Sequence, residues 1–140
     1  MLFRSKHFGL SKAIEGLLDD IGAVNTLQID LTADTFFEED IKYDFKLSVF
    51  RIVQEQMNNI IKHAQATQVN LELMRNNHMI YLKIADNGVG FDSKQHRKGI
   101  GLYNIISRAE VYNGIVDIET EPGKGCALYI TFPLNAEIFV

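Results

Sequence analysis

The chain has 140 residues and a mass of 15.9 kDa, which suits a single domain. Apolar types make up 46% of the residues and charged types 23%, so a packed core can form, while a net charge of −4 excludes a chain-wide basic surface for nucleic acid. The one cysteine, Cys126, excludes an internal disulfide and a metal site built on paired cysteines, and no 18-residue apolar span or signal peptide is visible.

The N-terminal part of the chain predicts a helix followed by a strand. Apolar residues recur at helical intervals over residues 9–22, and Ser11 lies near the start of this helix as the expected N-cap. Residues 27–31 alternate between apolar and polar types, which predicts a strand, and the polar, acidic stretch 32–40 predicts a loop.

The longest helix is expected over residues 44–66. Its apolar stripe consists of Leu47, Phe50, Val53, Met57, Ile60, Ile61 and Ala64. A second, polar stripe consists of Arg51, Glu55, Asn59 and His63. Each of these four residues is four positions from the last, and this spacing places side chains on one face of a helix.

A hairpin is expected after this helix. Residues 69–73 and 80–84 alternate between apolar and polar types, and Asn76 and Asn77 suit the turn between the two strands. A glycine-rich loop follows at residues 86–92.

A shorter helix and a second hairpin complete the chain. Residues 99–102 open the helix, which reaches about Tyr112. Strands are expected at residues 115–121 and 126–133, joined by the Pro-Gly-Lys-Gly turn at 122–125.

This order of elements is not a strict alternation of strand and helix. It predicts an α+β fold, a two-layer α/β sandwich in which a mixed, mostly antiparallel sheet of about five strands is covered on one face by about three helices. We expect residues 1–140 to form one domain, with residues 1–8 as a remnant of a preceding linker.

The glycine loops fail three common motifs. The dinucleotide fingerprint would need a glycine where Asn104 stands. A Walker A loop would need Ser or Thr after the Gly-Lys pair at 123–124, where Gly125 stands. An EF-hand loop that begins at Asp86 would need a glutamate where Arg97 stands.

The glycines before the shorter helix still suit an anion. Gly99 and Gly101 lie just before the helix, whose exposed backbone amides and dipole attract groups such as phosphate. Lys94, Arg97 and Lys98 lie directly upstream and could add positive charge. A capped helix beside a solvated basic loop explains the same residues, so both interpretations stay open at this point.

The polar stripe of the long helix suits a metal ion. Glu55 and Asn59 could bind a hard cation through oxygen, with Lys62 or His63 near a phosphate. Magnesium needs only one or two protein ligands where it also binds substrate phosphates. An ordinary solvated helix face is the alternative.

The loop after the second strand of the first hairpin suits a ligand with an amino group. Asp86 ends this strand, so its carboxylate could accept a hydrogen bond from the ligand. Gly88 and Gly90 would let the ligand approach the backbone closely. A tight turn with left-handed glycines is the alternative.

The order of these pieces is more specific than any one of them. The chain contains, in this order, Arg51-Ile-Val-Gln-Glu55-Gln-Met-Asn-Asn59-Ile-Ile-Lys62-His63-Ala64, Asp86-Asn-Gly88-Val-Gly90-Phe91, Gly99-Ile-Gly101-Leu102 and Pro122-Gly123-Lys-Gly125. Over residues 45–134 it resembles the catalytic, ATP-binding domain of sensor histidine kinases, in the GHKL (Bergerat-fold) superfamily, with these segments as its N, G1 and G2 boxes and late glycine turn. The Arg-x-x-Gln-Glu pattern, the Lys-His-Ala ending and a short lid resemble the subfamily that phosphorylates LuxR/NarL-type response regulators.

The resemblance implies ATP and Mg²⁺ as cofactors and a role for each matching residue. Asn59 would hold Mg²⁺, and Glu55 would help to bind the ion or polarise a water. Asp86 would accept a hydrogen bond from the adenine amino group. The other residues implied around the nucleotide are Lys62, His63 and Lys98 near phosphate or ribose, Gly88 and Gly90 beside the base, and Gly99, Gly101 and Leu102 at the phosphates.

The chain also departs from the family's pattern. Cys126 stands where the superfamily usually has a threonine that helps to hold the adenine edge, and a thiol is a weaker hydrogen-bonding group, so we expect a lower adenine affinity. No histidine is followed by an acidic residue, as the phosphoacceptor box requires, and the paired dimerisation helices are absent. We therefore expect an isolated C-terminal domain, monomeric by itself, that positions Mg–ATP for transfer of the γ-phosphoryl group to a histidine on a separate domain.

The expected partners are the dimerisation and histidine-phosphotransfer helices and, indirectly, a LuxR/NarL-type response regulator, with no direct contact to nucleic acid. The domain would be cytoplasmic, even where the parent protein is anchored in a membrane. Two alternatives remain from the sequence. One is a stand-alone serine kinase of the anti-sigma-factor type, which shares the fold and needs no histidine domain. The other is a non-catalytic module that keeps the fold for protein contacts, and Cys126 is the motif change that favours it.

Overall fold

The computed structural model describes residues 8–34, 36–90 and 102–140. The elements of these residues follow in chain order as α1 (Leu10–Val24), β1 (Gln28–Thr32), α2 (Tyr43–Asn59), η2 (Ile60–Ala64), β2 (Gln68–Arg75), β3 (Met79–Asp86), α4 (Leu102–Glu110), β4 (Ile115–Thr120) and β5 (Cys126–Pro133). None of the described helices has both the length and the apolar character that crossing a membrane requires.

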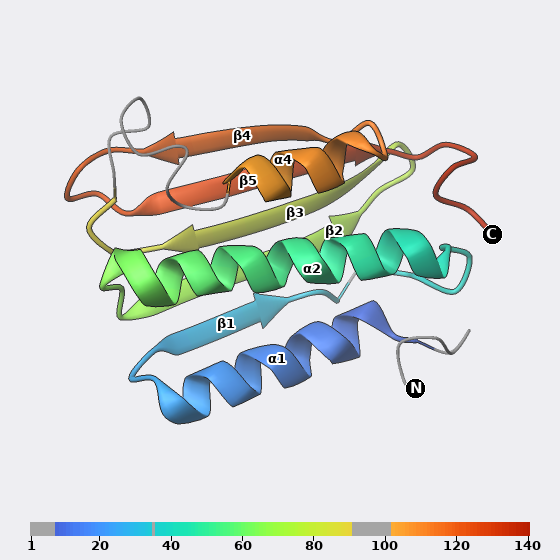
Figure 1. Cartoon of the computed structure of the whole chain (residues 1–140). Helices are drawn as coiled ribbons and strands as arrows, with labels where there is room; N and C mark the ends of the chain where they lie inside the picture. The colour runs from blue at the N-terminus through green and yellow to red at the C-terminus, as the bar shows by residue number, and fades with distance from the viewer. Residues whose placement is uncertain (1–7, 35, 91–101) are drawn as a thin grey trace.

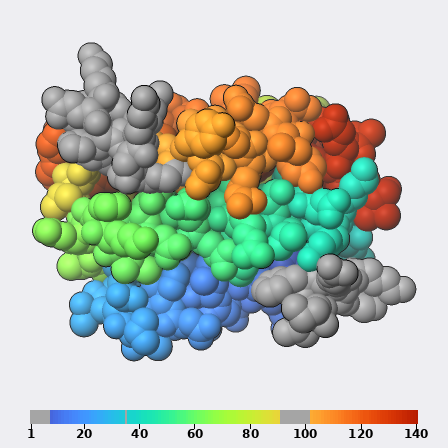
Figure 2. Space-filling model, in the orientation of Figure 1, coloured from blue at the N-terminus to red at the C-terminus, as the bar shows by residue number. Residues whose placement is uncertain are grey.

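The fold consists of two layers (Figure 1). Five strands form one sheet in the order β1-β2-β3-β5-β4, in which β1 and β2 are parallel and the other neighbours are antiparallel. The three α-helices of the described residues lie side by side over one face of this sheet, with α2 between α1 and α4, and their side chains form much of the surface seen in Figure 2. The predicted fold class, a mixed, mostly antiparallel sheet covered on one face by helices, is thus confirmed.

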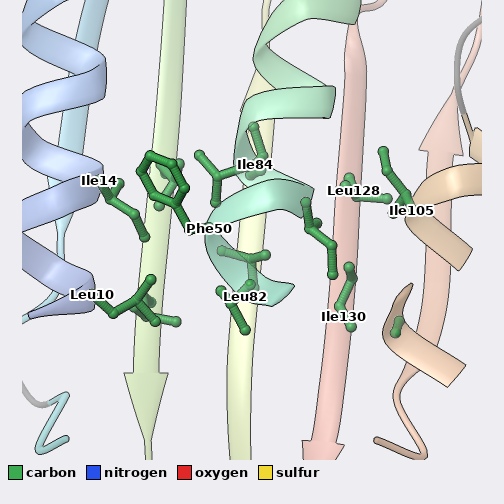
Figure 3. Packing of buried hydrophobic residues seen from close by; sticks show 14 of the residues in the cluster. Leu10, Ile14, Phe50, Leu82, Ile84, Ile105, Leu128 and Ile130 are labelled. Carbon is green, nitrogen blue, oxygen red and sulfur yellow. The ribbon is translucent and has the colours of Figure 1, made fainter. Parts of the chain in front are cut away.

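The core lies between the two layers because the strands alternate. In β2, Val69, Leu71 and Leu73 are buried against the helices, whereas Asn70 and Met74 are exposed on the other face. Figure 3 shows how the inner side chains of β3 and β5 meet those of the three helices, among them Leu10, Ile14, Phe50, Leu82, Ile84, Ile105, Leu128 and Ile130. Each such side chain contributes about 1.5–3 kcal/mol relative to an exposed one, so this layer dominates the stability of the fold.

The N-terminus of α1 corrects one prediction. Ser11 is not the N-cap, since α1 begins at Leu10 and the cap position is Gly9. The carboxylate of Glu38, from the loop before α2, instead accepts hydrogen bonds from the backbone N–H groups of Leu10 (2.5 Å) and Ser11 (3.2 Å). A negative charge at a helix N-terminus also complements the helix dipole. The cap therefore comes from a residue that no local pattern could indicate.

The end of the long helix differs from the prediction in a second way. We expected the helix to continue to residue 66, but α2 ends at Asn59 and the chain closes a single π-helical turn, η2, that ends at Ala64. Gln65 then adopts a left-handed conformation (φ 53°), which stops the helix. Single π-helical turns are often found at functional sites.

The end of the molecule that carries both described chain termini, on the right in Figure 1, is joined by charged side chains. The guanidinium of Arg75 binds both carboxylate oxygens of Asp40 (2.7 and 2.9 Å) and donates to the Phe37 carbonyl (2.8 Å). Nearby, buried Lys46 donates to the Phe8 carbonyl at 2.6 Å. These contacts join the loop before α2 to the sheet, and α2 to the start of the described chain.

Candidate functional site

Three of the four matched segments, as far as the structure describes them, meet at the opposite end of the sheet, on the left in Figure 1. The loop after β3 is bonded to the end of η2, because Val89 N–H donates to the Ala64 carbonyl at 2.7 Å. It is also bonded to the turn before β5, because Gly123 N–H donates to the Val89 carbonyl. The N box, the G1 box and the late glycine turn are therefore one connected unit.

Three glycines are required for these segments to fit together. A Cβ atom on Gly88 would overlap the Ala64 carbonyl oxygen, and one on Gly90 would overlap the Glu121 carbonyl oxygen. A Cβ atom on Gly125 would overlap the carbonyl oxygen of Asp86. Gly90 and Gly125 also have positive φ angles of 65° and 76°, which side chains disfavour. The fold therefore requires glycine at these three positions, whether or not a ligand is bound.

Asp86 lies in a row of three polar side chains on the helix-covered face of the sheet. Asp86 in β3 is opposite Cys126 in β5, which is opposite Thr120 in β4. The next row inward consists of Ile84, Leu128 and Ile118. On β3, β5 and β4 the inner face of the sheet thus changes from apolar to polar at the end where the glycine loops meet, whereas Val69, opposite Asp86 on β2, is apolar and buried.

The carboxylate of Asp86 is held at the edge of the core. Burial raises its pKa, and hydrogen bonds from the backbone N–H groups of Gly88 (2.8 Å) and Cys126 act in the opposite direction. Among the described residues, no Lys or Arg forms a salt bridge with it. A partly buried carboxylate with donors on one side suits a ligand that brings a further donor.

The Cys126 thiol is also half buried. Burial, followed by the negative charge of Asp86, raises its pKa to about 11, while a hydrogen bond with Thr120 opposes this rise. The thiol is therefore protonated at neutral pH, and it is a poor nucleophile. It acts in this row as a neutral, weakly polar group beside the Asp86 carboxylate.

Two residues of the polar stripe on α2, Asn59 and Glu55, have different neighbours. Asn59, in the last turn of α2, donates from Nδ2 to Gln56 Oε1 (3.2 Å), so its amide oxygen points away from Gln56. Glu55 is half buried and lies in a groove of about 580 Å³ between the helices. The groove is lined by Leu17, Ile21, Arg51, Gln54, Glu55, Asn58 and Arg108.

The remaining predicted residues vary in how far the structure describes them. Lys62 and His63 are exposed on η2, next to the Ala64 carbonyl that binds the loop after β3. Leu102 begins α4 with a side chain that is 2% exposed, so it packs in the core. Lys98, Gly99 and Gly101 lie outside the described residues.

Asn87 is not among the predicted site residues, yet it joins the loop after β3 to the start of β2. Its side-chain oxygen accepts hydrogen bonds from the backbone N–H groups of Thr67 (2.9 Å) and Gln68 (3.0 Å), and its nitrogen donates to Thr67 Oγ1 (2.9 Å). An Asn-Gly pair is a turn signal in the sequence, but the partners lie about 20 residues away and carry no local pattern.

No group of three or more His, Cys, Asp or Glu side chains in the described parts of the chain could hold a metal ion. A site for Mg²⁺ does not require such a group, since this ion keeps several waters and binds through one or two protein ligands plus phosphate oxygens. Asn59 and Glu55, which are one helical turn apart, can supply that number of oxygen ligands.

Comparison with known proteins agrees with this geometry. Residues 46–136, more than half of the chain, match the family described as histidine kinase-, DNA gyrase B-, and HSP90-like ATPase. The fold resembles the histidine kinase domain of the blue-light activated histidine kinase EL346 from Erythrobacter litoralis, with a TM-score of 0.73, 18% identity and coverage of 89% of this chain and 59% of that one.

Two curated relatives are more similar in sequence. The chain is 38% identical over 92 residues to the sensor histidine kinase ComP of Bacillus subtilis, over 64% of this chain and 12% of ComP. It is 32% identical over 135 residues to the histidine-protein kinase/phosphatase DegS of Brevibacillus brevis, over 86% of this chain and 34% of DegS. The chain thus spans about a third or less of these relatives.

The family match and both relatives confirm the resemblance that the order of the boxes indicated. The same N box, G1 box and late glycine turn meet at one end of the sheet, around Asp86. On these grounds, the chain belongs to the histidine kinase-, DNA gyrase B-, and HSP90-like ATPase family, and its relatives are sensor histidine kinases.

Proposed function

We propose that this chain is the ATP-binding catalytic domain of a sensor histidine kinase. It positions Mg–ATP so that the γ-phosphoryl group reaches a histidine on a separate helical domain. Phosphoryl transfer depends mainly on positioning and charge neutralisation, so a domain without its own phosphoacceptor can supply the catalytic part. The observation that carries this proposal is the half-buried Asp86 carboxylate at the polar end of the inner sheet face, where the family's boxes meet.

The base end of the proposed site consists of Asp86, Cys126, Gly88 and Gly90. Asp86 accepts a hydrogen bond from the exocyclic amino group of adenine, which guanine lacks at the equivalent position. The backbone N–H groups of Gly88 and Cys126 already orient this carboxylate, so part of its desolvation is compensated before the ligand arrives. Cys126 contacts the adenine edge as a neutral thiol.

The phosphate end of the proposed site lies at the end of α2 and in η2. Asn59 binds Mg²⁺ through its amide oxygen, and Glu55 binds the ion through water or orients a water. Lys62 and His63, exposed on η2, approach phosphate or ribose. Lys98, Gly99 and Gly101 complete this end by charge and backbone amides, with Leu102 at the start of α4. When bound, Mg²⁺ supplies counter-charge for the phosphate oxygens.

We further propose that the direct partner is the dimerisation and histidine-phosphotransfer part of the same kinase, and that the indirect partner is a LuxR/NarL-type response regulator. The similarity to ComP and DegS, both named as histidine kinases, supports the first part. The Arg51-x-x-Gln54-Glu55 pattern supports the second. The proposed domain is cytoplasmic and monomeric by itself.

The decisive experiment is calorimetric titration of the chain with ATP, with and without Mg²⁺, and with GTP as the control. We expect Mg²⁺-dependent binding of ATP and much weaker binding of GTP. If millimolar Mg–ATP gives no binding, the proposal is wrong and a non-catalytic module with this fold becomes the better interpretation. If ATP binds and label passes to a serine of a small partner protein, the serine-kinase alternative is correct.

The same titration tests the metal role of Asn59. Asn59→Asp should weaken Mg²⁺-dependent ATP binding by about 10-fold or more, since the new charge lies against phosphate and the neutral amide ligand is lost. Asn58→Asp is the matched control, because it adds the same charge one residue away on an exposed position. Equal effects of the two substitutions would remove Asn59 from the metal site.

A further inference from the structure

We infer that Thr120 is a positioning residue of the nucleotide site, which holds Cys126 and the turn of residues 123–125 against the base-reading carboxylate of Asp86. This inference rests on the proposed function and goes beyond it, because Thr120 lies outside the boxes that the resemblance covers. It assigns part of the adenine specificity to β4, a strand at the edge of the sheet.

The first observation is the direction of the Thr120 side chain. Along β4, Val116, Ile118 and Thr120 are the half-buried residues, whereas Ile115, Asp117 and Glu119 are exposed. Val116 and Ile118 pack against the core, so the alternation of the strand places Thr120 on the same, helix-covered face. Directly opposite residues of neighbouring strands have Cβ atoms about 4.5–5.5 Å apart, so Thr120 adjoins Cys126, and Cys126 adjoins Asp86.

The second observation is what the hydroxyl of Thr120 binds. It donates to the Gly125 carbonyl at 2.9 Å, and it forms a hydrogen bond with the Cys126 thiol. A hydroxyl has one donor and two acceptor positions, so it can serve both neighbours at once. One side chain of β4 thus binds two successive residues that begin β5.

The third observation connects these contacts to Asp86. Gly125 packs so closely on the Asp86 backbone that a Cβ atom would overlap its carbonyl oxygen. Cys126 donates its backbone N–H to the Asp86 carboxylate. Loss of the Thr120 hydroxyl would leave the Gly125 carbonyl without this donor and release the thiol. The turn, and with it the orientation of the carboxylate, would loosen while the boxes themselves stay intact.

The position of Thr120 also relates to Cys126, which stands where the superfamily usually has a threonine. The resemblance places a hydroxyl at residue 126, and this chain has a thiol there. The neighbouring strand supplies a hydroxyl in the same polar row, one strand further from Asp86. In this chain, therefore, the hydroxyl acts on adenine recognition through Cys126 and Gly125 and makes no contact with the base itself.

The experiment uses Thr120→Val, which keeps the shape of the side chain and removes the hydroxyl. By calorimetry with Mg–ATP and Mg–GTP, we expect the Kd for ATP to rise by about 3- to 10-fold, as for one neutral hydrogen bond, and the Kd for GTP to change less. The preference for ATP over GTP should therefore fall. Thr120→Ser keeps the hydroxyl and should restore the wild-type preference.

Thr131→Val is the matched control, because Thr131 lies in the same sheet on the face that the helices leave uncovered. It should leave both Kd values within about 2-fold of the wild type. A second test combines Thr120→Val with Cys126→Thr. A hydroxyl at residue 126 lies next to Asp86 without the help of Thr120, so Thr120→Val should cost less affinity in that background.

The outcomes separate the inference from the function on which it rests. If the wild type binds neither nucleotide, the proposed function is wrong and the inference falls with it. If the wild type prefers ATP and Thr120→Val keeps the same preference, the inference alone is wrong. If Thr120→Val weakens ATP and GTP equally, or Thr120→Ser fails to restore the preference, Thr120 has only a structural role and the inference is also wrong.

Discussion

Two aspartates at opposite ends of the sheet show how differently the two ends are built. Asp40, at the end that carries the termini, forms a two-pronged hydrogen-bonded pair with Arg75, which lowers the pKa of Asp40. Asp86, at the end where the glycine loops meet, has its pKa raised by burial. One carboxylate is stabilised in its charged form by the fold, whereas the charged form of the other carries a desolvation penalty.

The two ends also differ in the groups that connect neighbouring segments of the chain. At the Asp40 end, long side chains such as Arg75 and Lys46 join segments that are distant in the chain. At the Asp86 end, carbonyl oxygens and glycines touch directly. These close backbone contacts leave no room for side chains, and they surround a half-buried carboxylate that has acceptor positions left for a ligand. The two ends therefore differ in the kind of contact that holds them: charged side chains pair at the Asp40 end, and closely packed backbone surrounds a half-buried carboxylate at the Asp86 end.

The largest effect is expected from Gly125→Ala. The new Cβ atom would overlap the Asp86 carbonyl oxygen, and φ at this residue is 76°, so we expect a loss of about 3 kcal/mol or more in the free energy of unfolding. Gly123→Ala is the matched control, since its φ is 82° but no atom lies within 4 Å of the added Cβ, and it should cost only about 1 kcal/mol. Urea unfolding measures both. If both substitutions cost the same free energy of unfolding, the packing of Gly125 against Asp86 does not exclude a side chain.

The next effect is on binding. Asp86→Asn should weaken ATP binding by about 10- to 100-fold and reduce the preference for adenine over guanine, because an amide at this position can turn a donor toward the base. Thermal unfolding should show whether the weaker ATP binding of Asp86→Asn comes from a less stable fold. The raised pKa of Asp86 means that its ionised form costs stability above the ordinary value of 3.8, so Asp86→Asn should keep or raise the Tm at pH 7. A large fall in Tm with unchanged nucleotide preference would contradict the comparison.

The smallest effect is expected at the other end. Asp40→Asn should lower the free energy of unfolding at pH 7 by about 0.5–1 kcal/mol, because the pair with Arg75 is partly exposed, and it should leave nucleotide binding unchanged. The pKa of Asp40 is lowered in the folded state, so its contribution is present above the ordinary value of 3.8 and is lost as the pH falls below that value. The Tm difference from the wild type should therefore close in acid. Asp19→Asn, exposed on α1, is the control and should change the free energy of unfolding at pH 7 by less than about 0.5 kcal/mol.

Much of the fold could be predicted from the sequence because its elements are locally periodic. The strand expected at 126–133 matches β5, and the hairpin expected around Asn76 matches β2 and β3. The hairpin succeeded because Asn76 caps its own turn, accepting hydrogen bonds from the N–H groups of His78 and Met79. The cap of α1 and the end of α2 could not be predicted this way. The first depends on Glu38, and at the second Ala64 binds Val89, 25 residues further along the chain.

The alternation that forms the two layers and the order of the boxes can be recognised in the amino-acid sequence alone. The boxes in turn indicated the family, and Asp86 as the candidate base-reading residue. Such features are encoded by residue types at short spacing, which is what periodicity and motifs record. The residues that support Asp86, in contrast, are brought together by the three-dimensional fold. Pairing of β3, β5 and β4 brings Thr120 into the same row as Cys126 and Asp86, although Thr120 is 34 residues from Asp86 in the chain. Register between strands depends on the packing of the whole sheet, and no local pattern in β4 carries it.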